Sequence, residues 1–131
     1  MKPFIIENVI ANDDVLEFVA LDGRNVKVQL IGDCCSSSYF DDNSKVDAKG
    51  LFGERLMTLE STGRDPGEPD PNDEEDYPRT LYYALIIRTD KQSITVDWRN
   101  VSNGYYRGWT NIFVDGEPVY GDLDFRQAEA G

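Results

Sequence analysis

Histidine is absent from this chain of 131 residues. It is the commonest general base and the commonest metal ligand in proteins. Its absence excludes a Ser-His-Asp or Cys-His catalytic site built within one chain. No other arrangement of residues points to catalytic machinery. We therefore expect a protein that is not an enzyme and that holds no cofactor and no metal.

Cysteine is nearly as scarce, and the only two are Cys34 and Cys35. Adjacent cysteines rarely bond to each other because the ring they would close is strained. A disulfide framework is therefore excluded, and a reducing compartment fits best. The sequence also has no apolar run typical of a signal peptide or a membrane span. We expect a cytoplasmic protein.

Basic residues are few, with 13 against 25 acidic ones, which gives a formal net charge of −12. A field of this sign repels nucleic acid and anionic membranes and favours basic partners. We therefore expect neither direct nucleic-acid binding nor membrane contact. The alternative is that the acidity serves only to keep the protein in solution.

Short runs of alternating apolar and polar residues, separated by turn signals, are typical of strands. They predict one mainly β domain, or α+β with little helix, over residues 1–126. Its sheet is antiparallel or mixed, and a small barrel or a sandwich is a candidate architecture. We expect residues 32–53 to be irregular apart from one helical turn within 46–52. We expect the last residues, 127–131, to fray. The predicted strands are 4–10, 15–21, 26–30, 55–61, 81–89, 93–98 and 109–114.

Residues 64–78 combine several prolines with a run of acids and have no apolar periodicity. Such a segment cannot bury a core, so we expect a mobile loop. Its carboxylates could mimic the phosphates of nucleic acid or dock on a basic groove. A solvated linker is the alternative, and the ordered spacing of a calcium loop is missing. The candidate partner-binding residues are Asp70, Asp73, Glu74, Glu75 and Asp76.

A second motif, residues 32–40, follows a predicted strand and is rich in small and hydroxyl residues. Successive backbone N–H groups and hydroxyls of this kind can bind an anion. The lysine and the spacing of a phosphate loop are absent. The acidic neighbours would raise the thiol pKa, so buried cysteines in a polar turn are favoured over a reactive thiol. The candidate ligand-binding residues are Asp33, Cys34, Cys35, Ser36, Ser37 and Ser38.

A third motif, residues 100–109, gathers aromatic rings and an arginine around an Asn-Gly turn, and Arg99 directly precedes it. These residue types are favoured at binding hot spots, and they can also stack on a base while an arginine pairs with phosphate. The alternative is a hairpin whose aromatic residues cover the edge of the core. The candidates for partner binding are Tyr105, Tyr106, Arg107 and Trp109, and those for ligand binding are Arg99, Asn103, Tyr106 and Arg107.

Three features occur in a familiar order: the Gly-Asp-Cys-Cys-Ser motif, the sequence Leu51-Phe52-Gly53, and the stretch from Trp98 to the Ser-Asn-Gly-Tyr-Tyr motif. With them, residues 5–110 resemble an uncharacterised family of small proteins encoded by tailed phages and prophages. In that family a glycine usually follows the tyrosine pair, whereas Arg107 stands here. The acidic insertion at 64–78 is also peculiar to this chain. The resemblance implies an origin and no activity.

Three functions stay open at this stage. The first is a non-enzymatic phage accessory protein that inhibits a host protein with a basic surface, such as a nucleic-acid-handling or immune defence component, in the host cytoplasm. The second is a sponge that sequesters a small phosphorylated, nucleotide-like signalling molecule. The third is a structural or metabolic phage protein with no anti-host role. The first would use the acidic segment 64–78 and the aromatic motif as its contact. The second depends on whether the motifs at 32–40 and 100–109 meet in the fold, which the sequence does not decide.

Overall fold

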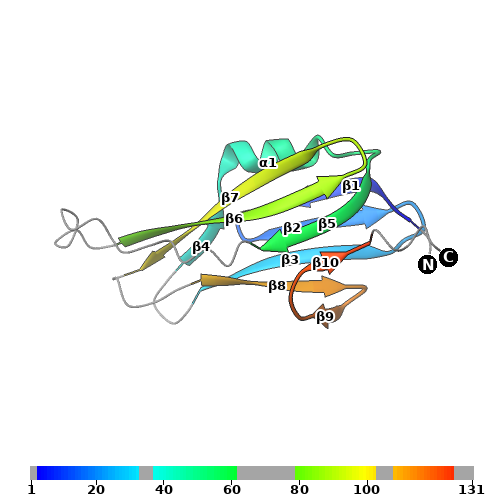
Figure 1. The fold of residues 1–131 in the computed structure, drawn as a ribbon. Helices are drawn as coiled ribbons and strands as arrows, with labels where there is room; N and C mark the ends of the chain where they lie inside the picture. Colours follow the sequence, from blue (N-terminus) through cyan, green and yellow to red (C-terminus); the bar gives the residue numbers. More distant parts are fainter. Residues whose placement is uncertain (1–2, 33–36, 62–78, 103–107, 126–131) are drawn as a thin grey trace.

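The computed structural model describes residues 3–32, 37–61, 79–102 and 108–125. These residues form ten strands and one short helix, α1 (Asp42–Lys49) (Figure 1). The strands are β1 (Phe4–Ala11), β2 (Val15–Ala20), β3 (Asn25–Gly32), β4 (Ser37–Phe40), β5 (Arg55–Ser61), β6 (Arg79–Thr89), β7 (Ser93–Ser102), β8 (Gly108–Val114), β9 (Glu117–Val119) and β10 (Leu123–Asp124).

All strand pairs are antiparallel, and the sheet order is β4-β7-β6-β5-β1-β2-β3-β8-β9, with β10 on β5. The prediction of a mainly β domain is thus confirmed, and the sheet is not closed into a barrel. The sheet changes direction at β1, which pairs with β2 along most of its length but with β5 only at Phe4 and Ile5. We call β4, β7, β6, β5 and β10 the first half of the sheet, and β1, β2, β3, β8 and β9 the second half.

The core lies between the two halves, because alternate side chains of each strand point inward. In β2 the buried residues are Leu16, Phe18 and Ala20, and the residues between them are partly exposed. The largest buried side chain is Trp98 of β7, which is 1% exposed. Its ring stacks on Tyr83 of β6 with centroids 4.2 Å apart and an interplanar angle of 10°. Aromatic pairs of this kind add to the free energy gained by burial.

Two hairpins close as the sequence signals predict. The turn at Asp22-Gly23 joins β2 to β3, and Gly23 adopts a φ of 89°. The β8–β9 turn has positive φ at both Asp115 (52°) and Gly116 (85°), as type I′ turns require. A side chain at Gly23 or Gly116 would strain the backbone, although there is space for it.

The segment expected to be irregular holds more structure than the sequence indicates. Residues Ser37–Phe40 form β4, which pairs with β7 over four positions. The helix begins at Asp42, four residues earlier than the predicted turn, because the Asp41 side chain caps it by accepting from the Ser44 amide at 3.3 Å. The prediction of an irregular stretch with one turn at 46–52 was therefore wrong in this part.

Several expectations lie outside the described residues. These are the mobile acidic loop at 64–78 and the frayed tail at 127–131. Within the described ranges, the one helix has eight residues, and no helix is long and apolar enough to cross a membrane.

We predict that Trp98→Ala lowers the free energy of unfolding by about 3–5 kcal/mol, because it removes a large buried ring and leaves a cavity. Urea unfolding followed by circular dichroism measures the change. Tyr120, which is 92% exposed, provides the control. Its replacement by Ala should change the free energy by less than about 0.5 kcal/mol. Equal effects of the two substitutions would contradict the assigned core.

Candidate functional site

The strand pairing brings the ends of two sequence motifs together. Gly32 at the end of β3 lies opposite Gly108 at the start of β8. Ser37 at the start of β4 lies opposite Val101, near the end of β7. Described residues that flank positions 33–36 in the chain are therefore paired with described residues close to 103–107 in the chain. Figure 1 shows the end of β7 and the starts of β6 and β8 on the same side of the molecule.

A buried polar chain joins three strands at this end. Asn100 of β7 is fully buried, and its Nδ2 donates to Ser38 Oγ of β4 at 3.0 Å. The same hydroxyl donates to the backbone oxygen of Ile31 in β3, also at 3.0 Å. Buried polar groups need such partners to offset the loss of water. These two hydrogen bonds connect β7 and β4 of the first half of the sheet to β3 of the second half, so Ser38 has a structural role here.

Arg99 lies on the other face of β7, with a side chain that is 38% exposed. Its Nη2 is 3.6 Å from Oδ1 of Asp41, the residue that caps α1. The guanidinium therefore has a carboxylate beside it, which weakens its attraction for a phosphate. Together with the bonded hydroxyl of Ser38, this pairing disfavours an anion site built from the described residues.

Four residues of the predicted sites are described. Ser37 is exposed at the start of β4, Ser38 and Arg99 are bonded as above, and Trp109 is 45% exposed on β8. Trp109 lies opposite Ile31, beside the ends of the two motif segments. The other candidates lie outside the described residues: Asp33, Cys34, Cys35, Ser36, Asp70, Asp73, Glu74, Glu75, Asp76, Asn103, Tyr105, Tyr106 and Arg107.

An acidic surface that the sequence analysis missed lies where α1 meets the β1–β2 turn. Lys45 of α1 bonds both Asp13 of the turn and Asp42 of the first helical turn, each at 2.9 Å. The Lys45 side chain is 16% exposed, whereas the side chains of Asp13 and Asp42 are 88% and 94% exposed. Hydrogen bonds to Asp42 and then to Asp13 raise the pKa of Lys45. The Lys45 side chain is thus largely covered, whereas the Asp13 and Asp42 carboxylates face the solvent.

We define the α1 acidic surface as Asp13, Asp14, Asp41, Asp42 and Asp47. Two acidic doublets of the sequence, 13–14 and 41–42, lie far apart in the chain, and only the fold joins them. Among the described residues, the basic ones on α1 or in contact with this surface are Lys45, Lys49 and Arg99, so the five carboxylates outnumber them.

Apolar side chains accompany these carboxylates. Val46 is 68% exposed and follows Asp42 by one helical turn, so the two share a face of α1. Phe52, just beyond the helix, is 67% exposed. An apolar side chain within an acidic rim is suited to a basic protein surface that also carries an apolar residue.

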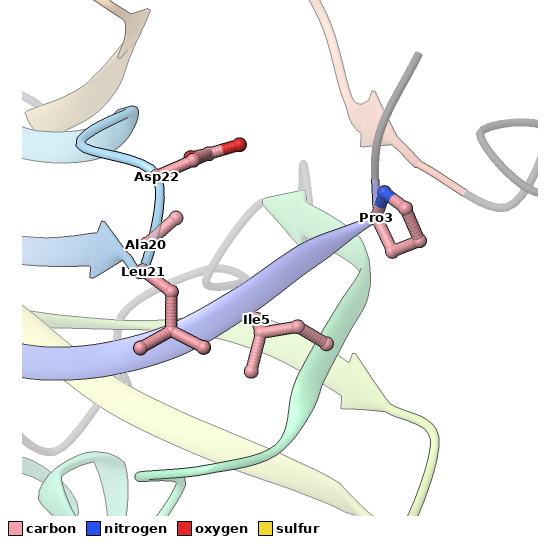
Figure 2. Close-up of a pocket in the computed structure, with 5 residues that line it drawn as sticks. All are labelled: Pro3, Ile5, Ala20, Leu21 and Asp22. Atoms are coloured by element: carbon pink, nitrogen blue, oxygen red, sulfur yellow. The ribbon is translucent and has the colours of Figure 1, made fainter.

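A pocket of about 230 Å³ lies beside the β2–β3 turn (Figure 2). Its walls are Pro3, Ile5, Ala20 and Leu21, and Asp22 lies at its edge. Leu21 is 66% exposed. The pocket is small and apolar, and it presents one carboxylate, so it offers no set of convergent polar groups of the kind that defines a catalytic pocket.

The edge of this pocket is held by one arginine. Arg24 Nε donates to both oxygens of Asp22, at 2.8 and 3.0 Å, and Nη2 donates to the Pro3 backbone oxygen at 2.7 Å. The Arg24 guanidinium also lies 5.5 Å from the Phe4 ring centroid. The side-chain hydrogen bond from Arg24 lowers the pKa of Asp22.

Within the part of the chain that the structure describes, no group of three or more Cys, Asp or Glu side chains is arranged to hold a metal ion. Glu54 is the one buried carboxylate among the residues that the structure describes, and it accepts from Thr89 Oγ1 at 2.5 Å and from Gln92 Nε2 at 2.7 Å. Both partners belong to the β6–β7 hairpin, so Glu54 fastens that turn.

The fold and these surfaces define a small open antiparallel β-sheet domain with an acidic surface where α1 meets the β1–β2 turn. Residues 4–110 match the model of a domain of unknown function, DUF7448, and the chain belongs to this family. No curated protein and no solved structure matches the chain significantly. The matched range agrees closely with the range of the family resemblance seen in the sequence.

We predict that Ser38→Ala lowers the free energy of unfolding by about 1–3 kcal/mol, because it removes the acceptor of Asn100 Nδ2 and the donor to Ile31. Ser37→Ala at the exposed neighbouring position is the matched control and should change it by less than about 0.5 kcal/mol. Urea unfolding measures both. If the two substitutions have the same small effect, the buried polar chain does not stabilise the fold.

A second prediction concerns pH. The pKa of Asp22 is lower in the folded state than in the unfolded state, because Arg24 bonds its charged form. The bond between Arg24 and the charged Asp22 therefore stabilises the fold fully above the ordinary carboxyl pKa. This stabilisation is lost as the pH falls through the lowered pKa of Asp22 in the folded state. Wild type should be more stable than Asp22→Asn at neutral pH, and the difference should shrink in acid. Urea unfolding at several pH values tests this, and a difference that stays constant from neutral to strongly acidic pH refutes it.

Proposed function

We propose that this protein is a non-enzymatic binding protein whose partner is a protein with a basic surface. The observation that carries the proposal is the α1 acidic surface. On this surface the Lys45 side chain is largely covered, whereas Asp13 and Asp42 are highly exposed. Val46 on the same helix is exposed as well. Such an arrangement supplies both charge and a small apolar contact to a partner.

The overall charge supports the same conclusion. A net charge of −12 accelerates the encounter with a basic partner, and exposed carboxylates act mainly on the association rate. The absence of histidine supports a role in binding rather than in acid–base chemistry. The exposed Trp109 provides a second contact of the type found at hot spots.

The finer proposal is that the chain is a phage accessory protein that acts in the host cytoplasm by blocking a host protein. Its support is the resemblance of the Gly-Asp-Cys-Cys-Ser and Ser-Asn-Gly-Tyr-Tyr motifs to phage-encoded proteins. Proteins that handle nucleic acid, including defence components, carry basic grooves that recognise phosphates. Outward-facing carboxylates are suited to such grooves, and the acids of residues 64–78 would extend the contact.

The sponge for a phosphorylated ligand is the second candidate. The observation in its favour is the pairing of Gly32 with Gly108, which brings the ends of the two motif segments together. Against it, Ser38 donates to a backbone oxygen and Arg99 lies beside Asp41. The protein partner is therefore the better-supported function.

The test compares two charge-matched double variants in affinity capture from a lysate of the bacterium that carries the gene. Asp42→Asn with Asp47→Asn changes the α1 acidic surface, and Glu117→Gln with Asp122→Asn changes exposed acids elsewhere. We expect wild type and the control to capture the same basic protein and the α1 variant to lose about tenfold or more in affinity.

The association rate with that protein, purified, should fall steeply between about 50 mM and about 500 mM salt because charge steers the encounter. The activity of the captured protein, measured with and without this chain, decides whether binding inhibits it. Equal capture by both double variants would refute the role of the α1 acidic surface, and a rate independent of salt would remove charge from the explanation. Calorimetry with cyclic and linear nucleotides distinguishes the two candidate functions. A sponge should release heat on binding a nucleotide and should capture no protein.

A further inference from the structure

The outer edge of β8 is paired along only part of its length. β3 pairs with the whole of β8, whereas β9, on the opposite side, pairs only with Ile112–Val114 (Figure 1). After β9 the chain turns away through Gly121, which has a φ of 90°, and β10 then pairs with β5. Among the described residues, no strand borders Gly108–Asn111 on this side. We call the backbone edge of Gly108–Asn111 that faces away from β3 the open β8 edge.

The register of the ladders shows which backbone groups of the open β8 edge lie beside no strand. The Asp115 amide donates to the Asn25 oxygen at 3.0 Å, so the backbone of Asp115 points toward β3. Backbone groups alternate in direction along a strand, so the odd-numbered residues of β8 also point toward β3 and the even-numbered ones point away. β9 pairs with the even-numbered residues within Ile112–Val114. The N–H and C=O groups of Gly108 and Thr110 therefore point outward, with no strand beside them in the part of the chain that the structure describes.

β9 carries the features that protect a sheet edge, and the open β8 edge does not. Pro118 lies opposite Phe113, whose backbone points toward β3, so the outward side of Pro118 has no N–H to offer. Glu117, next to it, is charged and exposed. Proline and charge are common means by which natural proteins prevent a further strand from adding to an edge. β8 contains neither a proline nor a charged residue, so the open β8 edge can accept a strand.

Trp109 determines which side chain an added strand would present. The residue is 45% exposed and lies between Gly108 and Thr110. Because its own backbone groups point toward β3, a residue opposite it on an added strand would form a non-hydrogen-bonded pair, in which the two side chains are closest. Aromatic rings stabilise aromatic and β-branched neighbours across such a pair. An apolar side chain opposite Trp109 is therefore expected.

The charge of the whole chain restricts the occupant further. The open β8 edge itself brings no charge, but it belongs to a chain of net charge −12. A second copy carries the same charge and is repelled, whereas a segment that carries lysine or arginine beside its apolar positions is attracted.

From these observations we infer that the open β8 edge binds an extended, basic peptide segment of a partner protein, which adds a strand to the sheet. Backbone hydrogen bonds to Gly108 and Thr110 would give affinity with any sequence, and the contact with Trp109 would give selectivity. This edge and the α1 acidic surface consist of different residues. Either proposal can therefore fail while the other stands.

The test changes one outward-facing amide. Thr110→Pro removes that N–H and preserves the ladder with β3, because the backbone groups of Thr110 point away from β3. Thr110→Val is the matched control, since it keeps the N–H and the β-branched shape. The probe is a display library of random linear peptides, selected on wild type. We expect it to yield peptides with alternating apolar residues and lysine or arginine. These should bind Thr110→Val like wild type and Thr110→Pro about tenfold or more weakly.

Amide hydrogen exchange locates the bound peptide. In the free protein the Thr110 amide should exchange faster than the Asn111 amide, which points toward β3. A bound peptide should slow exchange at Thr110. Trp109→Thr removes the exposed ring, keeps a residue that favours strands, and should also weaken binding about tenfold. This second variant guards against misfolding of Thr110→Pro, and circular dichroism shows which variants have folded.

Several results would overturn the inference. The first is a library that yields no binder, and the second is peptides that bind folded Thr110→Pro and Trp109→Thr as tightly as wild type. Peptides that the double variant Asp42→Asn with Asp47→Asn loses, and that Thr110→Pro retains, would belong to the α1 acidic surface instead. Self-association of wild type that Thr110→Pro abolishes would make a second copy the occupant of the open β8 edge.

Discussion

The burial of Trp98 between neighbouring strands is the packing interaction on which much of this structure depends. Trp98 lies opposite Tyr83 on β6 and opposite Phe40 on β4, and both neighbours face the core. β4 is only four residues long and would not form in isolation. Pairing with β7 gives it backbone partners, and the core contact of Phe40 holds it there. The helix follows from this placement, because Asp41 directly after β4 caps α1 and its amide donates to the Asp97 oxygen of β7.

This arrangement separates the charges of the molecule. Once α1 is fixed against β7, Lys45 reaches Asp13 of the β1–β2 turn, and the acids around it face outward. On β2 and β3, by contrast, Glu17 and Lys27 lie directly opposite each other. Charge would steer the proposed basic partner to the α1 acidic surface.

The pairing of β4 with β7 also positions the hydrogen-bonded residues at the end of the sheet where Gly32 lies opposite Gly108. The chain from Asn100 through Ser38 to Ile31 holds β7, β4 and β3 together by hydrogen bonds within the protein. Of these three residues, Ser38 is a candidate ligand group when only the residue types are known. In the fold its hydroxyl is bonded to Asn100 and Ile31, and the described candidate residues that are still exposed and without such a bond are Ser37 and Trp109.

The sequence by itself determined the class of fold, because alternation with period two and the Asp-Gly turns are local signals. It also determined the net charge of −12, on which the proposal of a basic partner rests. It did not show β4, since Ser37–Phe40 has no apolar alternation and becomes a strand only through its partner β7. It did not show the α1 acidic surface, because Asp13 and Asp42 are joined through Lys45 across a long separation in the chain. Only the tertiary structure decided which polar groups face each other and which face solvent, since that depends on strand order and register, and no short stretch of sequence encodes these.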